Sequence, residues 1–268
     1  MVAFDLHCHS RHSDGVPTVH AIEEHCHKHG LGVALTDHNE IRGALELAER
    51  GRVPCLPATE IGTAEGFEFL AYFGDLAVLE AFYREVMEPH LLKRYMVHSR
   101  ISTDEVLESA RSFDLFLSLA HPFALGRKSI RAPRHSRAMV RRILGQVHAL
   151  ERHNGALPER WNRQAEELLE RFPLKYTVGS DAHRLRELGS VRLEIETEAD
   201  DGPAGHFEAL REGRLGEWQA RGSRPSAKGT ASLAYRHLAF YLTSGRSSGR
   251  KANPPKRTTR SSRSQPSR

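Results

Sequence analysis

The sequence lacks the features that define several classes of protein. Its three cysteines, Cys8, Cys26 and Cys55, show no CxxC spacing, and no basic segment followed by an apolar one opens the chain. An odd cysteine count without a signal peptide argues against a disulfide framework and favours a reducing compartment. No apolar run approaches the ~20 residues that a membrane span requires. We therefore expect a soluble, cytoplasmic protein with no membrane partner.

Acidic residues are missing from one end of the chain. Residues 221–268 contain twelve of the 39 lysines and arginines and no aspartate or glutamate, which leaves 27 basic and 34 acidic residues, a net charge of −7, in residues 1–220. The apolar fraction of 39% and the mean hydropathy of −0.52 indicate that part of the chain does not pack. We expect one domain over 1–220 and a basic Ser/Arg/Pro-rich tail over 221–268, with one helix at 231–243 and otherwise disordered. Nonspecific binding of nucleic acid and a solubilising role both stay open for this tail.

The pattern of apolar residues predicts alternating strands and helices, which is typical of an α/β fold. A first strand precedes His7, and further strands are expected at 31–35, 53–58, 67–73, 115–120, 147–150, 175–179 and 191–195. The segment 67–73 is expected to form a hairpin with the strand before it. Helices are expected at 17–30, 41–50, 76–98 with an interruption at Pro89, 102–113, 138–145, 158–172 and 206–213.

The predicted strands end in side chains that can bind metal ions. These are His7 and His9, Asp37 and His38, Glu60, His121, Glu151, and Asp181 and His183. In a barrel of parallel strands all these ends meet on one face, where such barrels hold their active sites. His7 and His9 lie two apart, on the same face of a strand, so Cys8 must point to the other face and into the core. Imidazole and carboxylate ligands suit Mn, Fe or Zn.

Five motifs resemble those of the PHP (polymerase and histidinol phosphatase) family. They are His7-Cys8-His9 with Asp14-Gly15, Thr36-Asp37-His38-Asn39, Glu60, Ala120-His121-Pro122 and Ser180-Asp181-Ala182-His183, and the resemblance extends to about residue 195. It implies a distorted (β/α)7 TIM-like barrel that holds two or three divalent ions. By this resemblance the first ion would be held by His7, His9, Glu60 and Asp181. Glu60 would bridge to a second ion, which His121 also holds. Asp14, His38 and His183 would hold the third.

The sequence departs from the family at Glu68, where relatives often have a histidine ligand to the second ion. Glu68 could itself bind as a carboxylate and favour a harder ion, or the second site could be weak. His90 or His98 could substitute, although a surface position is the more common one for such histidines. His12 has no assigned metal.

A phosphate ester also needs contacts beyond the metal ions. Arg127, Lys128 and Arg131 follow His121, and Arg184 follows His183, so all four are candidates for binding phosphate, with a solvated loop as the alternative for each. Glu151, His153 and Asn154 resemble a family segment, Glu-x-x-Asn-Gly, at the mouth of the barrel, which Asn154 and Gly155 match and which implies a role in the substrate pocket. Asp37 precedes His38 and either orients a histidine behind the metal ligands or shapes a turn.

The hypothesis that these residues favour is a metal-dependent hydrolase of phosphate esters. Its substrate would be the phosphomonoester of a small metabolite or nucleotide, attacked at phosphorus by a hydroxide that bridges metal ions. One alternative is a nuclease or phosphodiesterase that acts on oligonucleotides and gathers them through the basic tail. Another is a non-catalytic module that binds nucleic acid through the tail, although the nearly complete ligand set argues against it.

Overall fold

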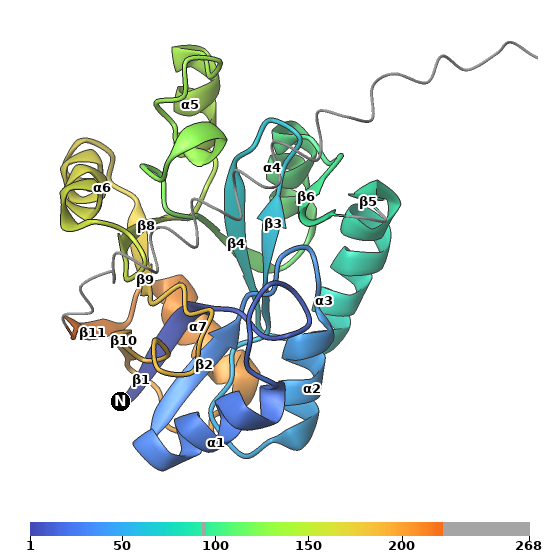
Figure 1. The fold of residues 1–268 in the computed structure, drawn as a ribbon, viewed down its shortest axis with the longest axis vertical. Helices are drawn as coiled ribbons and strands as arrows, with labels where there is room; N and C mark the ends of the chain where they lie inside the picture. Colours follow the sequence, from blue (N-terminus) through green and yellow to red (C-terminus); the bar gives the residue numbers. More distant parts are fainter. Residues whose placement is uncertain (93–94, 222–268) are drawn as a thin grey trace, which may run out of the picture. The chain divides into compact units, whose positions relative to one another are not determined.

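The computed structural model describes residues 1–92 and 95–221 (Figure 1). The expected tail over 221–268, including the helix at 231–243, lies outside these residues apart from Arg221. The strands are β1 (Val2–Cys8), β2 (Leu31–Leu35), β3 (Ala58–Gly62), β4 (Glu68–Phe73), β5 (Leu91–Leu92), β6 (Tyr95–Ser99), β7 (Leu115–Leu119), β8 (Ala149–Asn154), β9 (Lys175–Gly179), β10 (Val191–Ile195) and β11 (Leu215–Ala220). The α-helices are α1 (Val19–His29), α2 (Arg42–Arg50), α3 (Leu76–Phe82), α4 (Thr103–Ser112), α5 (Arg137–Leu144), α6 (Glu159–Arg171) and α7 (Gly202–Glu212).

Two main sheets carry the fold, which confirms a mixed α/β structure. The first has the order β11-β10-β1-β2 and the second the order β3-β4-β7-β8-β9. The pairs β1/β2, β7/β8 and β8/β9 are parallel. Helices α1 and α2 pack beside β2, as Figure 1 shows. Three isolated parallel bridges, Cys8–Ala182, Val33–Cys55 and His38–Glu60, connect residues of the first sheet with residues next to or within the second.

Several strand pairs are antiparallel, and one of them, β3/β4, confirms the hairpin expected for 67–73. β4 is antiparallel to both β3 and β7, and β10 is antiparallel to β1. The physical reason for β4 is the tight β3–β4 hairpin, in which Gly66 has a φ of 102° that few other residues adopt. The reversal has a consequence for the site. Glu68 begins β4 opposite Gly62, and it therefore lies at the same edge of the sheet as residues that follow the other strands.

Helix boundaries agree closely with the capping residues in the sequence. Thr18 caps α1 by accepting a hydrogen bond from the N–H of Ala21 at 3.1 Å, and Gly30 ends it in the left-handed conformation. Ser102 and Glu105 form a reciprocal capping box at the start of α4. Gly51, also left-handed, ends α2. The helices predicted around these residues are confirmed to within two residues at each end.

The long helix predicted over 76–98 is wrong in its second half. Helix α3 ends at Phe82 and continues as a π-helical turn, Tyr83–Met87, and a 3-10 turn, Glu88–His90. Leu91 is extended. Pro89 has no N–H to continue the helical hydrogen bonds, so the chain leaves the helix there. The sequence analysis also missed β11, which pairs with β10 and extends the first sheet to Ala220.

The core lies against both sheets, and its burial explains the apolar runs. Every residue of β4 and β7 is buried, as expected for strands covered on both faces. Cys8 packs with Val19, Ile22 and Leu35 and is 1% exposed, so it belongs to the core as predicted. In the described part of the chain, no helix combines the length and the hydrophobicity needed to cross a bilayer.

Candidate metal centre

The first group of ligands lies where β1 approaches the end of β9. The N–H of Asp181 donates to the His7 carbonyl at 2.7 Å, and the N–H of His9 donates to the Ala182 carbonyl at 2.9 Å. Gly179 makes this approach possible, because a Cβ atom there would stand 2.3 Å from His7 Cβ. The two histidines of β1 and the carboxylate of Asp181 are thereby placed together.

In this first set, each histidine lies close to both carboxylates. Glu60 Oε2 lies 3.4 Å from His7 Nε2 and 3.5 Å from His9 Nε2. Asp181 Oδ1 lies 3.7 Å from His7 Nε2 and 3.2 Å from His9 Nε2. Ligand atoms bound at 2.0–2.2 Å around a tetrahedral ion are about 3.4 Å apart. The ligand atoms of His7, His9 and Glu60 thus all lie within 4.8 Å of one another, and Asp181 lies beside both histidines.

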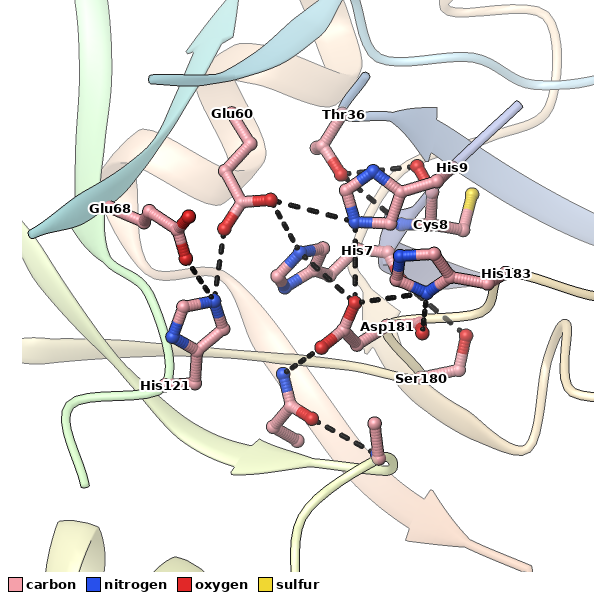
Figure 2. A network of polar contacts seen from close by, with 12 residues as sticks. His7, Cys8, His9, Thr36, Glu60, Glu68, His121, Ser180, Asp181 and His183 are labelled. Carbon is pink, nitrogen blue, oxygen red and sulfur yellow. Dashed lines mark hydrogen bonds and ion pairs between the residues drawn. The ribbon is translucent and has the colours of Figure 1, made fainter. Parts of the chain in front are cut away.

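A second set forms around His121, and Figure 2 shows its ring facing the carboxylates of Glu60 and Glu68. His121 Nε2 lies 2.9 Å from Glu60 Oε1 and 3.2 Å from Glu68 Oε2. The ammonium group of Lys128 lies 2.5 Å from Glu68 Oε2. Glu60 thus joins the first and second sets through its two oxygens. The second set differs from the first in that a lysine side chain contacts one of its carboxylates.

The third set consists of Asp14, His38 and His183. Asp14 Oδ2 lies 3.1 Å from His183 Nε2 and 3.9 Å from His38 Nε2. The other ring nitrogen of His183, Nδ1, donates to the Asp181 carbonyl at 2.9 Å, which turns Nε2 toward Asp14. The ligand atoms of His9, Asp14, His38 and His183 all lie within 4.8 Å of one another, so His9 links this set to the first.

Two of the candidate ligands have a backbone that non-glycine residues rarely adopt. His121 has a φ of 25° and Asp181 a φ of 53°. Each is held there by a hydrogen bond from its own N–H, to Glu151 Oε2 at 2.6 Å for His121 and to the His7 carbonyl for Asp181. Such strain is retained where the surrounding structure enforces it, and it concentrates at functional sites.

Opposite charges within the cluster shift its pKa values strongly. Burial lowers the pKa of His121, but its hydrogen bonds with Glu60 and Glu68 outweigh burial and raise it to about 10. Burial raises the pKa of Glu68, but Lys128 and His121 outweigh burial and lower it to about 2. For His183, Asp14 outweighs burial and raises the pKa to about 9. Without a metal ion, His121 and His183 are thus held as cations by the carboxylates, whereas burial lowers the pKa of His9.

Several buried ligand atoms are left without a hydrogen bond to any described residue. They include His7 Nε2, both ring nitrogens of His9, Glu60 Oε2 and His38 Nδ1. Buried polar atoms are rarely left in this way unless a ligand satisfies them. Nitrogen and oxygen donors in this proportion suit Mn, Fe or Zn. The residues present therefore fit divalent metal ions.

Glu151, which the sequence analysis placed at a strand end and in the segment at the barrel mouth, contacts two of the candidate ligands. Its Oε1 accepts a hydrogen bond from His7 Nδ1 at 2.8 Å, which leaves His7 Nε2 directed at the first set. Its Oε2 accepts from the N–H of His121 and from Asn154 Nδ2, the latter at 3.1 Å. Asn154 Nδ2 is also 3.3 Å from Asp181 Oδ2. Glu151 and Asn154 thus orient ligands from behind.

Asp37 faces the loop after β1 rather than a histidine. It accepts hydrogen bonds from the N–H and hydroxyl of Ser10 at 2.7 and 2.6 Å and from the Ser13 hydroxyl at 2.6 Å. These bonds correspond to the turn-shaping alternative. His12, left without a metal in the sequence analysis, pairs with Glu46 at 3.0 Å. His90 pairs with Glu105 at 3.6 Å, and the side chain of His98 lies outside the described part.

The candidate phosphate-binding cations are placed very differently from one another. Lys128 points at Glu68, as described above. Arg131 donates to Gln164 of α6 at 2.9 Å and stacks over the Phe123 ring, where it lines a cavity of about 550 Å³ between the helices α5 and α6. Arg184 pairs with Glu187 at 3.4 Å and is 40% exposed. The side chain of Arg127 lies outside the described part.

Comparison with known families and structures places this site in a wider context. A family model described as PHP-associated matches residues 159–215. No curated protein matches the chain. The fold is similar to that of a Bifidobacterium adolescentis protein provisionally described as a metal-dependent phosphoesterase, at 20% identity and a TM-score of 0.55, over 78% of this chain and 94% of that one.

Two further structures match over a smaller share of their own length. One is a two-domain protein of Bacteroides vulgatus that contains a predicted PHP-like metal-dependent phosphoesterase, with 19% identity, a TM-score of 0.56 and coverage of 80% of this chain and 63% of that one. The other is a lesion-specific endonuclease of Pyrococcus furiosus, with 20% identity, a TM-score of 0.61 and coverage of 81% and 57%. These findings confirm the resemblance of this chain to the PHP family.

Proposed function

We propose that this protein is a metal-dependent phosphoesterase that hydrolyses the phosphomonoester of a small metabolite or nucleotide. The observation that carries the proposal is the convergence of three sets of candidate ligands at distances that fit metal ions. Glu60 belongs to the first and second sets, and His9 belongs to the first and lies within reach of the third. Manganese, iron or zinc ions held there would supply Lewis acidity to the phosphoryl oxygens and to an attacking water. The fold similarity to proteins described as metal-dependent phosphoesterases supports this assignment.

The proposal includes a distorted (β/α)7 barrel as the scaffold. The Cys8–Ala182 bridge lies where β1 meets the chain after β9, and the His38–Glu60 bridge lies where the chain after β2 meets β3. We take these two bridges as the places where the two sheets join. Both bridges contain or adjoin candidate ligands, so the contacts that join the sheets would also bring the ligands together.

The protein's own side chains have defined tasks in this proposal. Glu151 holds the Nδ1 proton of His7, so that Nε2 keeps its lone pair directed into the first set. The backbone N–H groups of His121 and Asp181 fix the two strained ligands. Arg184, which follows His183 and is partly exposed, would bind the phosphate group of the substrate after leaving its ion pair with Glu187. Asn154, buried between Glu151 and Asp181, would hold both carboxylates in place.

A nuclease or phosphodiesterase acting on oligonucleotides is the second candidate. One protein of similar fold is an endonuclease, and residues 221–268 supply twelve basic side chains without an acidic one. Charge of this kind would bind the phosphate backbone without reading bases, and the binding would weaken as salt rises. The monoester is favoured because the candidate ligands His7, His9 and Glu60 are at most 1% exposed, which would leave a long polymer little access to them.

The test compares substrates on the metal-loaded protein. We expect release of phosphate from p-nitrophenyl phosphate and from mononucleotides, and at least about a hundredfold loss of kcat/KM in His9→Ala, equivalent to about 2.7 kcal/mol. His29→Ala, on an exposed position of α1, is the matched control and should keep full activity. If bis-p-nitrophenyl phosphate and oligonucleotides are cleaved faster, the second candidate replaces the first. Absence of hydrolysis with every phosphoester, or full activity in His9→Ala, would refute both.

A further inference from the structure

The second ligand set contains a lysine, which the other two sets do not. Lys128 Nζ lies 2.5 Å from Glu68 Oε2, and its side chain is only 14% exposed. The same carboxylate oxygen lies 3.2 Å from His121 Nε2. Lys128 is therefore part of the interior of this set and not a solvated loop residue.

The loop after His121 is shaped to bring Lys128 inward. Gly126 has a φ of 72° and begins the 3-10 turn Gly126–Lys128. The N–H of Ile130 then donates to the Pro122 carbonyl at 2.9 Å, which closes the loop on itself. Arg131, three residues after Lys128, is held instead against Gln164 of α6. These two described cations thus have different partners, and of the two it is Lys128 that reaches the ligand cluster.

The balance of charges in the cluster indicates a role for the ammonium group of Lys128. Five carboxylates face the three sets, namely Asp14, Glu60, Glu68, Glu151 and Asp181. Two divalent ions carry four positive charges and Lys128 carries the fifth. A further divalent ion beside Glu68 would meet the ammonium group at close range, where like charges in a partly buried site repel strongly. An ammonium group also offers only hydrogen-bond donors, so it cannot become a ligand while it stays protonated.

We propose that the ammonium group of Lys128 takes the place of a metal ion beside Glu68, so that the cluster binds two divalent ions and not three. One ion lies in the set of His7, His9, Glu60 and Asp181. The other lies in the set of Asp14, His38 and His183. Glu68 acts as the counter-ion of Lys128, which accounts for a carboxylate at this position. This inference rests on the proposed function, because it concerns the ions that the activity would use.

The experiment counts metal ions and does not depend on turnover. The full chain is stripped with a chelator, reloaded with excess Mn²⁺ or Zn²⁺, passed through a desalting column and analysed by mass spectrometry for metal per chain. Two ions are expected in the wild type and three in Lys128→Met, because Glu68 then has both oxygens available. The matched control Lys28→Met, on the exposed face of α1, should retain two.

A second variant keeps the test decisive if Lys128→Met fails to fold. Glu68→Gln should bind two ions, like the wild type, because Glu68 is not a ligand. Three ions in the wild type and two in Glu68→Gln would overturn the inference, as would two ions in a folded Lys128→Met. A wild type that binds two ions but hydrolyses no phosphoester would refute the proposed function and leave this inference standing.

Discussion

Replacing Glu151 by glutamine tests whether the residue behind His7 controls metal binding. The carboxylate accepts from His7 Nδ1 at 2.8 Å, from the His121 N–H at 2.6 Å and from Asn154 Nδ2 at 3.1 Å. A glutamine has one carbonyl oxygen, which can accept a hydrogen bond from His7 or from the other two donors but not from both. Its NH₂ group then faces another donor, with which it cannot form a hydrogen bond. At least one charge-assisted hydrogen bond is lost in either orientation.

The size of the effect follows from that loss. A hydrogen bond to a charged group contributes about 1.5–3 kcal/mol, which should appear as a lower free energy of unfolding of the metal-free protein. Loss of a partner that orients a ligand lowers metal affinity roughly 10- to 100-fold. We therefore expect Glu151→Gln to bind the ion of the first set in that range more weakly than the wild type.

The assay is competition with a chromophoric chelator, together with urea unfolding of the metal-free protein. Glu166→Gln is the matched control, because Glu166 pairs with Arg152 at 3.1 Å on a partly exposed surface of α6. Such a pair contributes about 0–1 kcal/mol and should leave metal affinity unchanged. A Glu151→Gln variant with wild-type metal affinity would show that His7 is oriented by other contacts, and the reasoning would be refuted.

Two further predictions concern pH and backbone packing. Metal affinity should increase as pH rises toward about 9. Burial lowers the pKa of His183, but Asp14 outweighs burial and raises it to about 9. At neutral pH a metal ion must therefore displace a proton from the His183 ring before it can bind there. Calorimetry in buffers of different ionisation enthalpy should then register proton release, and heats that do not depend on the buffer would contradict this. Gly179→Ala should lower the unfolding midpoint in urea and weaken metal binding, because its Cβ would stand 2.3 Å from His7 Cβ. Gly213→Ala is the control. Gly213 ends α7 in the left-handed conformation, so this substitution should lower the unfolding midpoint but leave metal affinity unchanged. Equal metal affinity in the two glycine variants would count against a close approach of β9 to His7.

The sequence by itself determined the elements that depend on local interactions. Helices α1, α2 and α4 begin and end at residues whose capping groups lie within a few positions, so their bounds could be predicted. The candidate ligands could also be named, because imidazoles and carboxylates next to buried strands have a recognisable pattern and resemble the PHP motifs. The β3–β4 hairpin could be predicted as well. The antiparallel pairing of β4 with β7 and of β1 with β10 could not, because it depends on which strand approaches from elsewhere in the chain.

Only the tertiary structure decided how those ligands are grouped. Lys128 lies 60 positions after Glu68, and Glu151 lies 144 positions after His7, so no local signal connects either pair. Each contact arises because strands distant in the sequence end at one edge of the fold. The sequence could suggest Lys128 as a phosphate ligand because a basic loop follows His121. Its burial against Glu68 became visible only in the structure, where the chain after β7 lies beside the first residue of β4. The charge of the site, unlike its ligand types, is therefore a property of the assembled fold.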